Sequence, residues 1–217
     1  MDKKERIAAR AARFFHQGDL VNLGIGMPTL VAYHLPDGVE VLLQSENGFI
    51  GLGPAPADGQ GEKDVVNAGG RPVTIVPGGS CFDSCMSFAL IRGGHVDATV
   101  LGALEVDQQG NIANWLVPGK LAPGMGGAMD LVAGANLVIV TMEHCTKDGA
   151  PKILKRCTLP LTAEHEVDYI VTELCVLRYN GQGLVLEELA PGVTVDEVLA
   201  KTGAELIIPE AAGRETQ

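Results

Sequence analysis

Two nearly continuous apolar runs constrain the fold more strongly than any other feature of the sequence. They cover residues 98–104 and 137–143 and are rich in leucine and valine. Such runs are typical of strands buried on both faces of a parallel sheet. Residues 20–23 form a third candidate strand, which leads through a glycine turn into a predicted helix that carries Pro28 near its start. We therefore predict an α/β fold with an open, mainly parallel sheet flanked by helices.

The remaining elements follow from periodicity and turn residues. We predict strands at 39–43, 73–76 and 168–174, a hairpin turn at 179–183, and helices at 3–17, 82–92 and 195–201. Residues 54–64 and 105–130 are predicted loops, and a loop as long as the second is usually functional. The sequence shows no linker or repeat, so we treat residues 1–217 as one domain.

Composition and charge exclude several classes of function. The formal net charge of −11 argues against a nucleic-acid-binding protein, which needs clustered Lys and Arg to meet phosphates. No apolar run approaches the roughly 18–20 residues of a membrane span, and no apolar targeting segment opens the sequence. The five cysteines are scattered, which indicates free thiols. We therefore expect a cytoplasmic protein that does not bind membranes.

Glu46 is the main catalytic candidate. It follows the predicted strand at 39–43, and α/β folds place ligand sites beyond the carboxyl ends of strands. Asn47 offers an amide beside it. Glycines that would let a bulky substrate approach the backbone follow at Gly48, Gly51 and Gly53. The residues alone leave open a general base, a metal ligand, a nucleophile, or a surface carboxylate without catalytic function.

Other reactive groups give weaker signals. The histidines lack metal-binding spacing, and Asp107 and Asn111 around Gly110 match only part of a calcium loop, so we predict no metal site. His144 and Cys145 are adjacent, but neighbours along a strand point to opposite faces. We therefore do not expect Cys–His catalysis.

Two glycine turns precede predicted helices. Gly24 and Gly26 flank Ile25, and Gly126 and Gly127 lie in the second turn. Each turn could present backbone N–H groups to an anion. The first lacks the third glycine of the dinucleotide fingerprint, and a P-loop is absent. The turns therefore predict a nucleotide-like ligand other than NAD or ATP.

Residues 43–51, Leu-Gln-Ser-Glu-Asn-Gly-Phe-Ile-Gly, resemble the signature around the active-site glutamate of family I CoA-transferases. The likeness to the β subunit of that family extends over nearly the whole chain. It includes residues 22–29, 87–95, 114–120, 124–132 and 157–162. The resemblance implies the CoA-transferase fold.

The resemblance also implies roles for particular residues. Glu46 would attack an acyl-CoA to give an acyl–glutamyl anhydride and then a glutamyl-CoA thioester, with coenzyme A as a substrate and no cofactor. The implied substrate- and CoA-binding residues are Asn22, Gly24, Gly26, Asn47, Gly48, Asn114, Gly126, Gly127 and Arg71. Some members carry a lysine after the Asn-Ala-Gly segment that helps to hold CoA, whereas here Gly70 and Arg71 follow it. Arg71 or the partner chain are the alternatives for that contact.

The resemblance further implies a partner. The α subunit of the family brings a glycine-rich CoA motif and an oxyanion donor, which these 217 residues lack. We therefore expect an α₂β₂ assembly that acts on an acyl-CoA and a short-chain carboxylic acid. Residues 2–7, 67–70 and 142–145 look most like the acetate/butyrate–acetoacetate branch, with the succinyl-CoA:3-oxoacid and 3-oxoadipate enzymes close behind. A non-catalytic ligand-sensing domain of the same fold is the alternative from another class.

Overall fold

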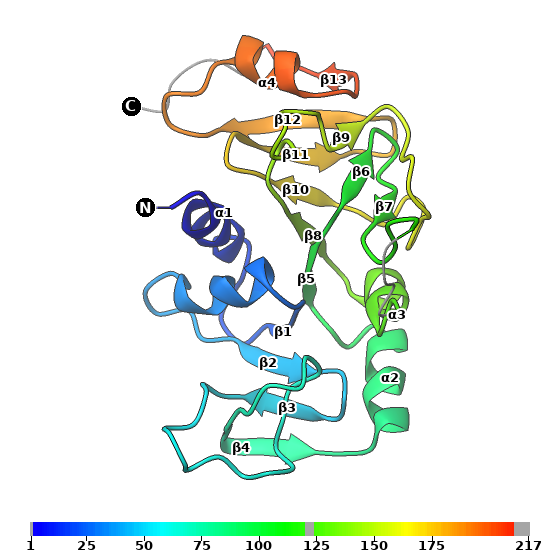
Figure 1. Cartoon of the computed structure of the whole chain (residues 1–217). Helices are drawn as coiled ribbons and strands as arrows, with labels where there is room; N and C mark the ends of the chain where they lie inside the picture. The colour runs from blue at the N-terminus through cyan, green and yellow to red at the C-terminus, as the bar shows by residue number, and fades with distance from the viewer. Residues whose placement is uncertain (1, 120–123, 211–217) are drawn as a thin grey trace.

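The computed structural model describes residues 2–119 and 124–210, and within them one large sheet crosses the molecule from end to end (Figure 1). Its ten strands lie in the order β13-β12-β11-β10-β8-β5-β1-β2-β3-β4. In chain order the strands are β1 Leu20–Leu23, β2 Leu42–Ser45, β3 Phe49–Leu52, β4 Ile75–Cys81, β5 Ala98–Gly102, β8 Val138–Thr141, β10 Tyr169–Val171, β11 Cys175–Tyr179, β12 Leu184–Leu189 and β13 Leu206–Ile207. A smaller sheet contains β6 Glu105–Asp107, β7 Ile112–Ala113 and β9 Ile153–Leu154.

The centre of the large sheet is parallel. Strands β10, β8, β5, β1 and β2 all pair in parallel, and β11, β12, β3 and β4 add antiparallel pairs outside them. The two apolar runs at 98–104 and 137–143 supply β5 and β8, which are neighbours in the middle of the sheet. The predicted open, mainly parallel α/β fold is therefore confirmed.

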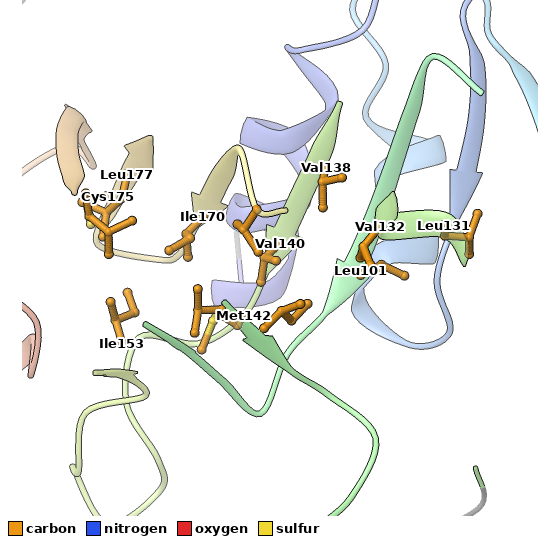
Figure 2. Packing of buried hydrophobic residues seen from close by; sticks show 14 of the residues in the cluster. Leu101, Leu131, Val132, Val138, Val140, Met142, Ile153, Ile170, Cys175 and Leu177 are labelled. Atoms are coloured by element: carbon orange, nitrogen blue, oxygen red, sulfur yellow. The ribbon is translucent and has the colours of Figure 1, made fainter. Parts of the chain in front are cut away.

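Helices cover both faces of the central strands. The helices are α1 Lys3–Ala12, the 3₁₀ helix η1 Met27–Tyr33, α2 Ser84–Arg92, α3 Ala128–Gly134 and α4 Val195–Lys201. On one face α1 buries Ile7 and Ala11 against a core that contains Val21 and Val100. On the other face Leu131 and Val132 of α3 pack with Leu101, Val138 and Val140, as Figure 2 shows. Alternate residues of each central strand thus enter different cores.

Several element boundaries differ from the prediction. The first helix ends at Ala12 rather than at residue 17, and the segment after Gly26 is a 3₁₀ helix. The predicted strand at 73–76 instead begins at Ile75 and continues through Pro77 to Cys81. Proline is tolerated there because β4 is an edge strand, and no described strand pairs with its outer side. The helix at 82–92 begins at Ser84, and Asp83 caps it by accepting a bond from the Met86 amide at 2.8 Å.

The prediction of one loop over residues 105–130 is wrong. This segment contains the β6–β7 hairpin and the first residues of α3, while Lys120 lies outside the described residues. Asp107 is fully buried, and its carboxylate accepts bonds from the amides of Gln109 and Cys157, each at 3.0 Å. This carboxylate therefore organises a turn inside the protein. Among the described helices, none is long and apolar enough to cross a bilayer.

Candidate active site

Glu46 lies in the tight turn that joins β2 to β3. The Gly48 amide donates to the Ser45 carbonyl at 3.0 Å, and the Gly48 carbonyl accepts from the Phe82 amide at 2.8 Å. Gly48 has φ +136°, and a Cβ added to it would lie 2.3 Å from the Phe82 carbonyl oxygen. A glycine is therefore required here, because the turn is held against the chain that enters α2.

One oxygen of Glu46 is held by the neighbouring strand. Asn22 of β1 is paired with Gln44 of β2 and is 1% exposed. Its Nδ2 donates to Gln44 Oε1 at 2.7 Å and to Glu46 Oε2 at 3.2 Å. Gln44 Nε2 in turn donates to Ser87 Oγ of α2 at 3.0 Å. The amide orientation of Asn22 is thus set by a buried chain of hydrogen bonds that reaches α2.

Gly127 brings the start of α3 against the same carboxylate side chain. A Cβ built on it would lie 3.3 Å from Glu46 Cγ and 3.3 Å from Phe88 Cζ. Gly126 before it has φ +55° in the left-handed region. The structure therefore brings together three of the predicted residues, Glu46, Asn22 and Gly127.

A loop formed by residues 65–72 folds over the turn that carries Glu46. Asn47 Nδ2 donates to the Val66 carbonyl at 2.8 Å, and the Ala68 amide donates to Ser45 Oγ at 3.0 Å. Arg71 is exposed on this loop, and its side chain forms no ion pair within the described part of the chain. The predicted cation therefore lies on a segment that is anchored beside Glu46.

The sequence matches the family of coenzyme A transferases over residues 4–201. This chain belongs to the coenzyme A transferase family. It is 57% identical over 217 residues to the beta chain of acetate CoA-transferase from Escherichia coli (strain K12), covering 100% of this chain and 98% of the relative. It is 49% identical over 210 residues to the B subunit of the probable succinyl-CoA:3-ketoacid coenzyme A transferase from Bacillus subtilis (strain 168), covering 97% of each.

The fold is also that of solved transferases. An acyl-CoA transferase of Escherichia coli O157:H7 superposes with a TM-score of 0.76 at 24% identity and covers 96% of this chain. This chain spans only 42% of that longer polypeptide. The comparison supports the architecture, and the β-subunit relatives match this coenzyme A transferase over nearly their whole length.

No contact with Glu46 is found in the described structure for the other predicted ligand residues of this transferase. Gly24 and Gly26 follow β1, where the Gly24 amide donates to the Val100 carbonyl at 2.8 Å. Asn114 is oriented by Thr162, whose hydroxyl donates to Asn114 Oδ1 at 2.7 Å. Their predicted contacts with CoA stay predictions.

The neighbouring residues His144 and Cys145 have separate surroundings. His144 is fully buried, with Nδ1 3.0 Å from Thr172 Oγ1 and Nε2 2.9 Å from Thr202 Oγ1. Burial lowers the pKa of His144 to about 4, and it raises the pKa of the Cys145 thiol. The sulfur at 4.0 Å from the His144 ring belongs to Cys175. In the described ranges, no three His, Cys, Asp or Glu side chains are grouped as metal ligands.

Sequence reasoning missed Gln44, Ser87 and Phe88 as parts of the site. Gln44 is two residues before Glu46, and both side chains accept from the Asn22 amide. That spacing was a usable signal. Ser87 and Phe88 carried none, because their positions depend on how α2 packs on the sheet.

Proposed function

We propose that this chain is the catalytic β subunit of an enzyme that moves CoA between a short-chain acyl-CoA and a carboxylic acid, with Glu46 as the nucleophile. The placement of Glu46 carries the proposal. Its carboxylate lies at the carboxyl end of β2, one oxygen accepts from Asn22 at 3.2 Å, and its Cγ is packed beside Gly127. Within the described residues Oε1 accepts no hydrogen bond, so this oxygen is available to attack a carbonyl carbon.

The reaction needs no added redox partner and consumes no water. Glu46 attacks the thioester carbonyl, the CoA thiolate leaves, and an acyl–glutamyl anhydride forms. The thiolate then attacks the glutamyl carbonyl, which releases the first carboxylate and leaves a glutamyl-CoA thioester. An incoming carboxylate repeats both steps in reverse, which makes a new acyl-CoA and restores Glu46. A carboxylate nucleophile suits this exchange because every intermediate is an anhydride or a thioester.

Both intermediates hydrolyse, so the site must exclude water. Phe49 is 5% exposed directly after the Glu46 turn, and Ile50 and Met27 are half-buried. We propose that these apolar side chains, together with the bound acyl-CoA, shield the glutamyl carbonyl. The Asn22 amide would keep donating to the glutamyl oxygen through the anhydride and thioester stages.

We propose an α₂β₂ assembly with a CoA-transferase α subunit, which is consistent with relatives named as beta or B subunits. Coenzyme A is then a substrate, and the chain acts as one domain without a bound cofactor or metal. Gly24, Gly26, Asn114, Gly126 and Arg71 are the proposed CoA contacts around Glu46. A cytoplasmic location fits the five free cysteines.

We propose acetate or butyrate and acetoacetate as the acids, since the acetate CoA-transferase relative is 57% identical over the whole chain. Succinyl-CoA:3-oxoacid or 3-oxoadipate transfer is the second candidate. The relative named for a succinyl-CoA reaction, at 49% identity, favours it. Comparing kcat/KM for acetyl-CoA and succinyl-CoA with acetoacetate as acceptor distinguishes the two.

Trapping of the thioester tests the role of Glu46. The complex with its α partner is incubated with acyl-CoA without an acceptor and is then treated with borohydride. Reduction of the thioester should inactivate the enzyme and convert the Glu46 carboxyl to an alcohol, a loss of one oxygen and a gain of two hydrogens on that peptide. The matched Glu46→Gln complex should show no mass change. Full survival of activity with an unmodified peptide would contradict a covalent role.

A further inference from the structure

A pocket of about 420 Å³ lies at the carboxyl ends of β5 and β8. Its walls come from the start of α1, the residues after β1, and the segments that follow β5 and β8. The polar side chains that matter below are Lys4, Thr141, Glu143, Lys147 and Lys152. Among the described residues, Glu46 and Asn22 do not line this pocket, but Met27, one of the side chains proposed to shield the glutamyl carbonyl, does line it, as does Ile25 between Gly24 and Gly26.

The topology explains why a pocket forms here. β1 lies between β2 and β5, and the chain leaves β1 through η1 on the face that α1 covers. The connection from β5 to β8 passes through α3 on the opposite face. The segments that follow β1 and β5 therefore diverge and leave a crevice at the carboxyl ends of these strands. Open α/β sheets bind ligands at this kind of position.

The charge of the pocket is opposite to that of the chain. The whole sequence has 16 Lys and Arg against 27 Asp and Glu, whereas the described residues that line the pocket include three lysines and one acid, Glu143. The half-buried Lys152 donates through Nζ to the Ala103 carbonyl at 3.1 Å. An ammonium group has three N–H donors, so this bond leaves two of them for another acceptor. Within the described residues Glu143 forms no ion pair.

A buried hydroxyl group points to the same ligand chemistry. Thr141 lines the pocket, is 1% exposed, and its Oγ1 has no hydrogen-bond partner in the described part of the chain. A buried hydroxyl without a partner carries a desolvation cost that a bound acceptor would relieve. Thr141 alternates with Val140 and Met142, which belong to the core under α3. Its side chain therefore points toward the α1 face, whereas the hydrogen bonds that hold Glu46 lead to α2.

We propose that this pocket, which shares the turn after β1 with the Glu46 site, is a second site that binds a small anion, a carboxylate or a phosphate group, without using the Glu46 carboxylate. Lys152 supplies a charge-assisted hydrogen bond and Thr141 a hydroxyl donor, and the exposed Lys4 and Lys147 add positive charge. The proposal goes beyond the transfer reaction and does not depend on it.

Thermal unfolding of the assembled complex tests the site, with phosphate and acetate compared against chloride at equal ionic strength. At about 50 mM of a bound anion, the wild type should gain about 2–5 °C over chloride. Lys152→Met should lose most of this gain. Lys155→Met is the matched control, because Lys155 is exposed and pairs with Glu205 at 2.9 Å outside the pocket. It should keep the full gain.

Thr141→Val provides a second variant that conserves volume. It should retain the fold, since the hydroxyl makes no bond in the described structure, and it should also lose part of the gain. A gain with phosphate alone or with acetate alone assigns the ligand class. Equal gains in wild type, Lys152→Met and Thr141→Val would overturn the proposal. The Glu46→Gln complex should keep the gain while losing transfer, so failure of the anion site and failure of the proposed function give different results.

Discussion

Replacing Gly127 with alanine tests whether the observed packing sets the position of the reacting carboxylate. The added Cβ would lie 3.3 Å from Glu46 Cγ and 3.3 Å from Phe88 Cζ. Carbon atoms are in optimal contact at about 3.5–4.0 Å, so each neighbour must move by a few tenths of an ångström. The methyl group would crowd both side chains at once, and we expect the Glu46 side chain to take part of the shift.

The size of the effect follows from this displacement. A misplacement of about 1 Å can cost about 10²-fold in rate, so a shift of about 0.3–0.5 Å on the same logarithmic scale lowers kcat about 4- to 10-fold. The stability change should stay within about 1 kcal/mol, because Gly127 has φ −83° and the weaker capping by alanine opposes its lower unfolded-state entropy. The KM for each substrate should change little.

Steady-state kinetics and thermal unfolding of the assembled complex provide the assay. Gly183→Ala is the control, since its added Cβ meets Ile207 at 3.4 Å, an ordinary contact in the distant β11–β12 turn. A Gly127→Ala enzyme with wild-type kcat and wild-type stability would refute the claim that this glycine positions Glu46. A large loss of stability would show instead that the backbone of α3 absorbs the clash.

Three further predictions follow from the described contacts. Gly48→Ala should lower the free energy of unfolding by about 3 kcal/mol or more, because the new side chain combines φ +136° with a 2.3 Å clash. Gly59→Ala is the control: its φ is +74° and the space around it is open, so it should lower the free energy of unfolding by about 1 kcal/mol in the same thermal unfolding assay. Asn22→Leu should lower kcat about 10²-fold by removing the donor to Glu46, and a kcat within about threefold of wild type would contradict this role. Burial lowers the pKa of His144 to about 4 in the folded state, below its ordinary value of 6.5. Between these two pH values the unfolded chain therefore binds more protons than the folded chain, so the stability should fall as the pH drops from 6.5 toward 4. At pH 5 the loss relative to neutral pH should be about 2 kcal/mol, and urea unfolding of His144→Gln should lack this component.

The central sheet could be predicted because burial on both faces leaves a direct mark on the sequence. The apolar runs that form β5 and β8 have no polar alternation, which is typical of strands in a parallel sheet covered by helices on both faces. Strand β4 gave the opposite signal. Pro77 and the glycines after it indicate a turn, and only the position of β4 at the edge of the sheet makes them compatible with a strand.

The residues of the candidate site also fall into two groups, those that could be predicted from the sequence and those that only the structure reveals. Glu46 was predicted from its local setting after a strand and before a glycine-rich turn, whereas the roles of Asn22 and Gly127 were implied by the family resemblance of the short motifs around them. The link from Gln44 to Ser87 joins residues 43 positions apart, and it exists only because α2 lies on one particular face of β2. A contact of that kind depends on tertiary packing, so no local pattern predicts it.

The alternation that builds the core also determines the position of the reactive carboxylate. Val21 is buried in the core under α1, and Asn22, the next residue, therefore faces α2 and reaches Glu46. A slip of one residue in the β1–β2 register would bring an apolar side chain beside Glu46 and place the Asn22 amide in the α1 core, where it would lack partners. The favourable free energy of burying Val21 therefore also stabilises the strand register in which Asn22 donates to Glu46.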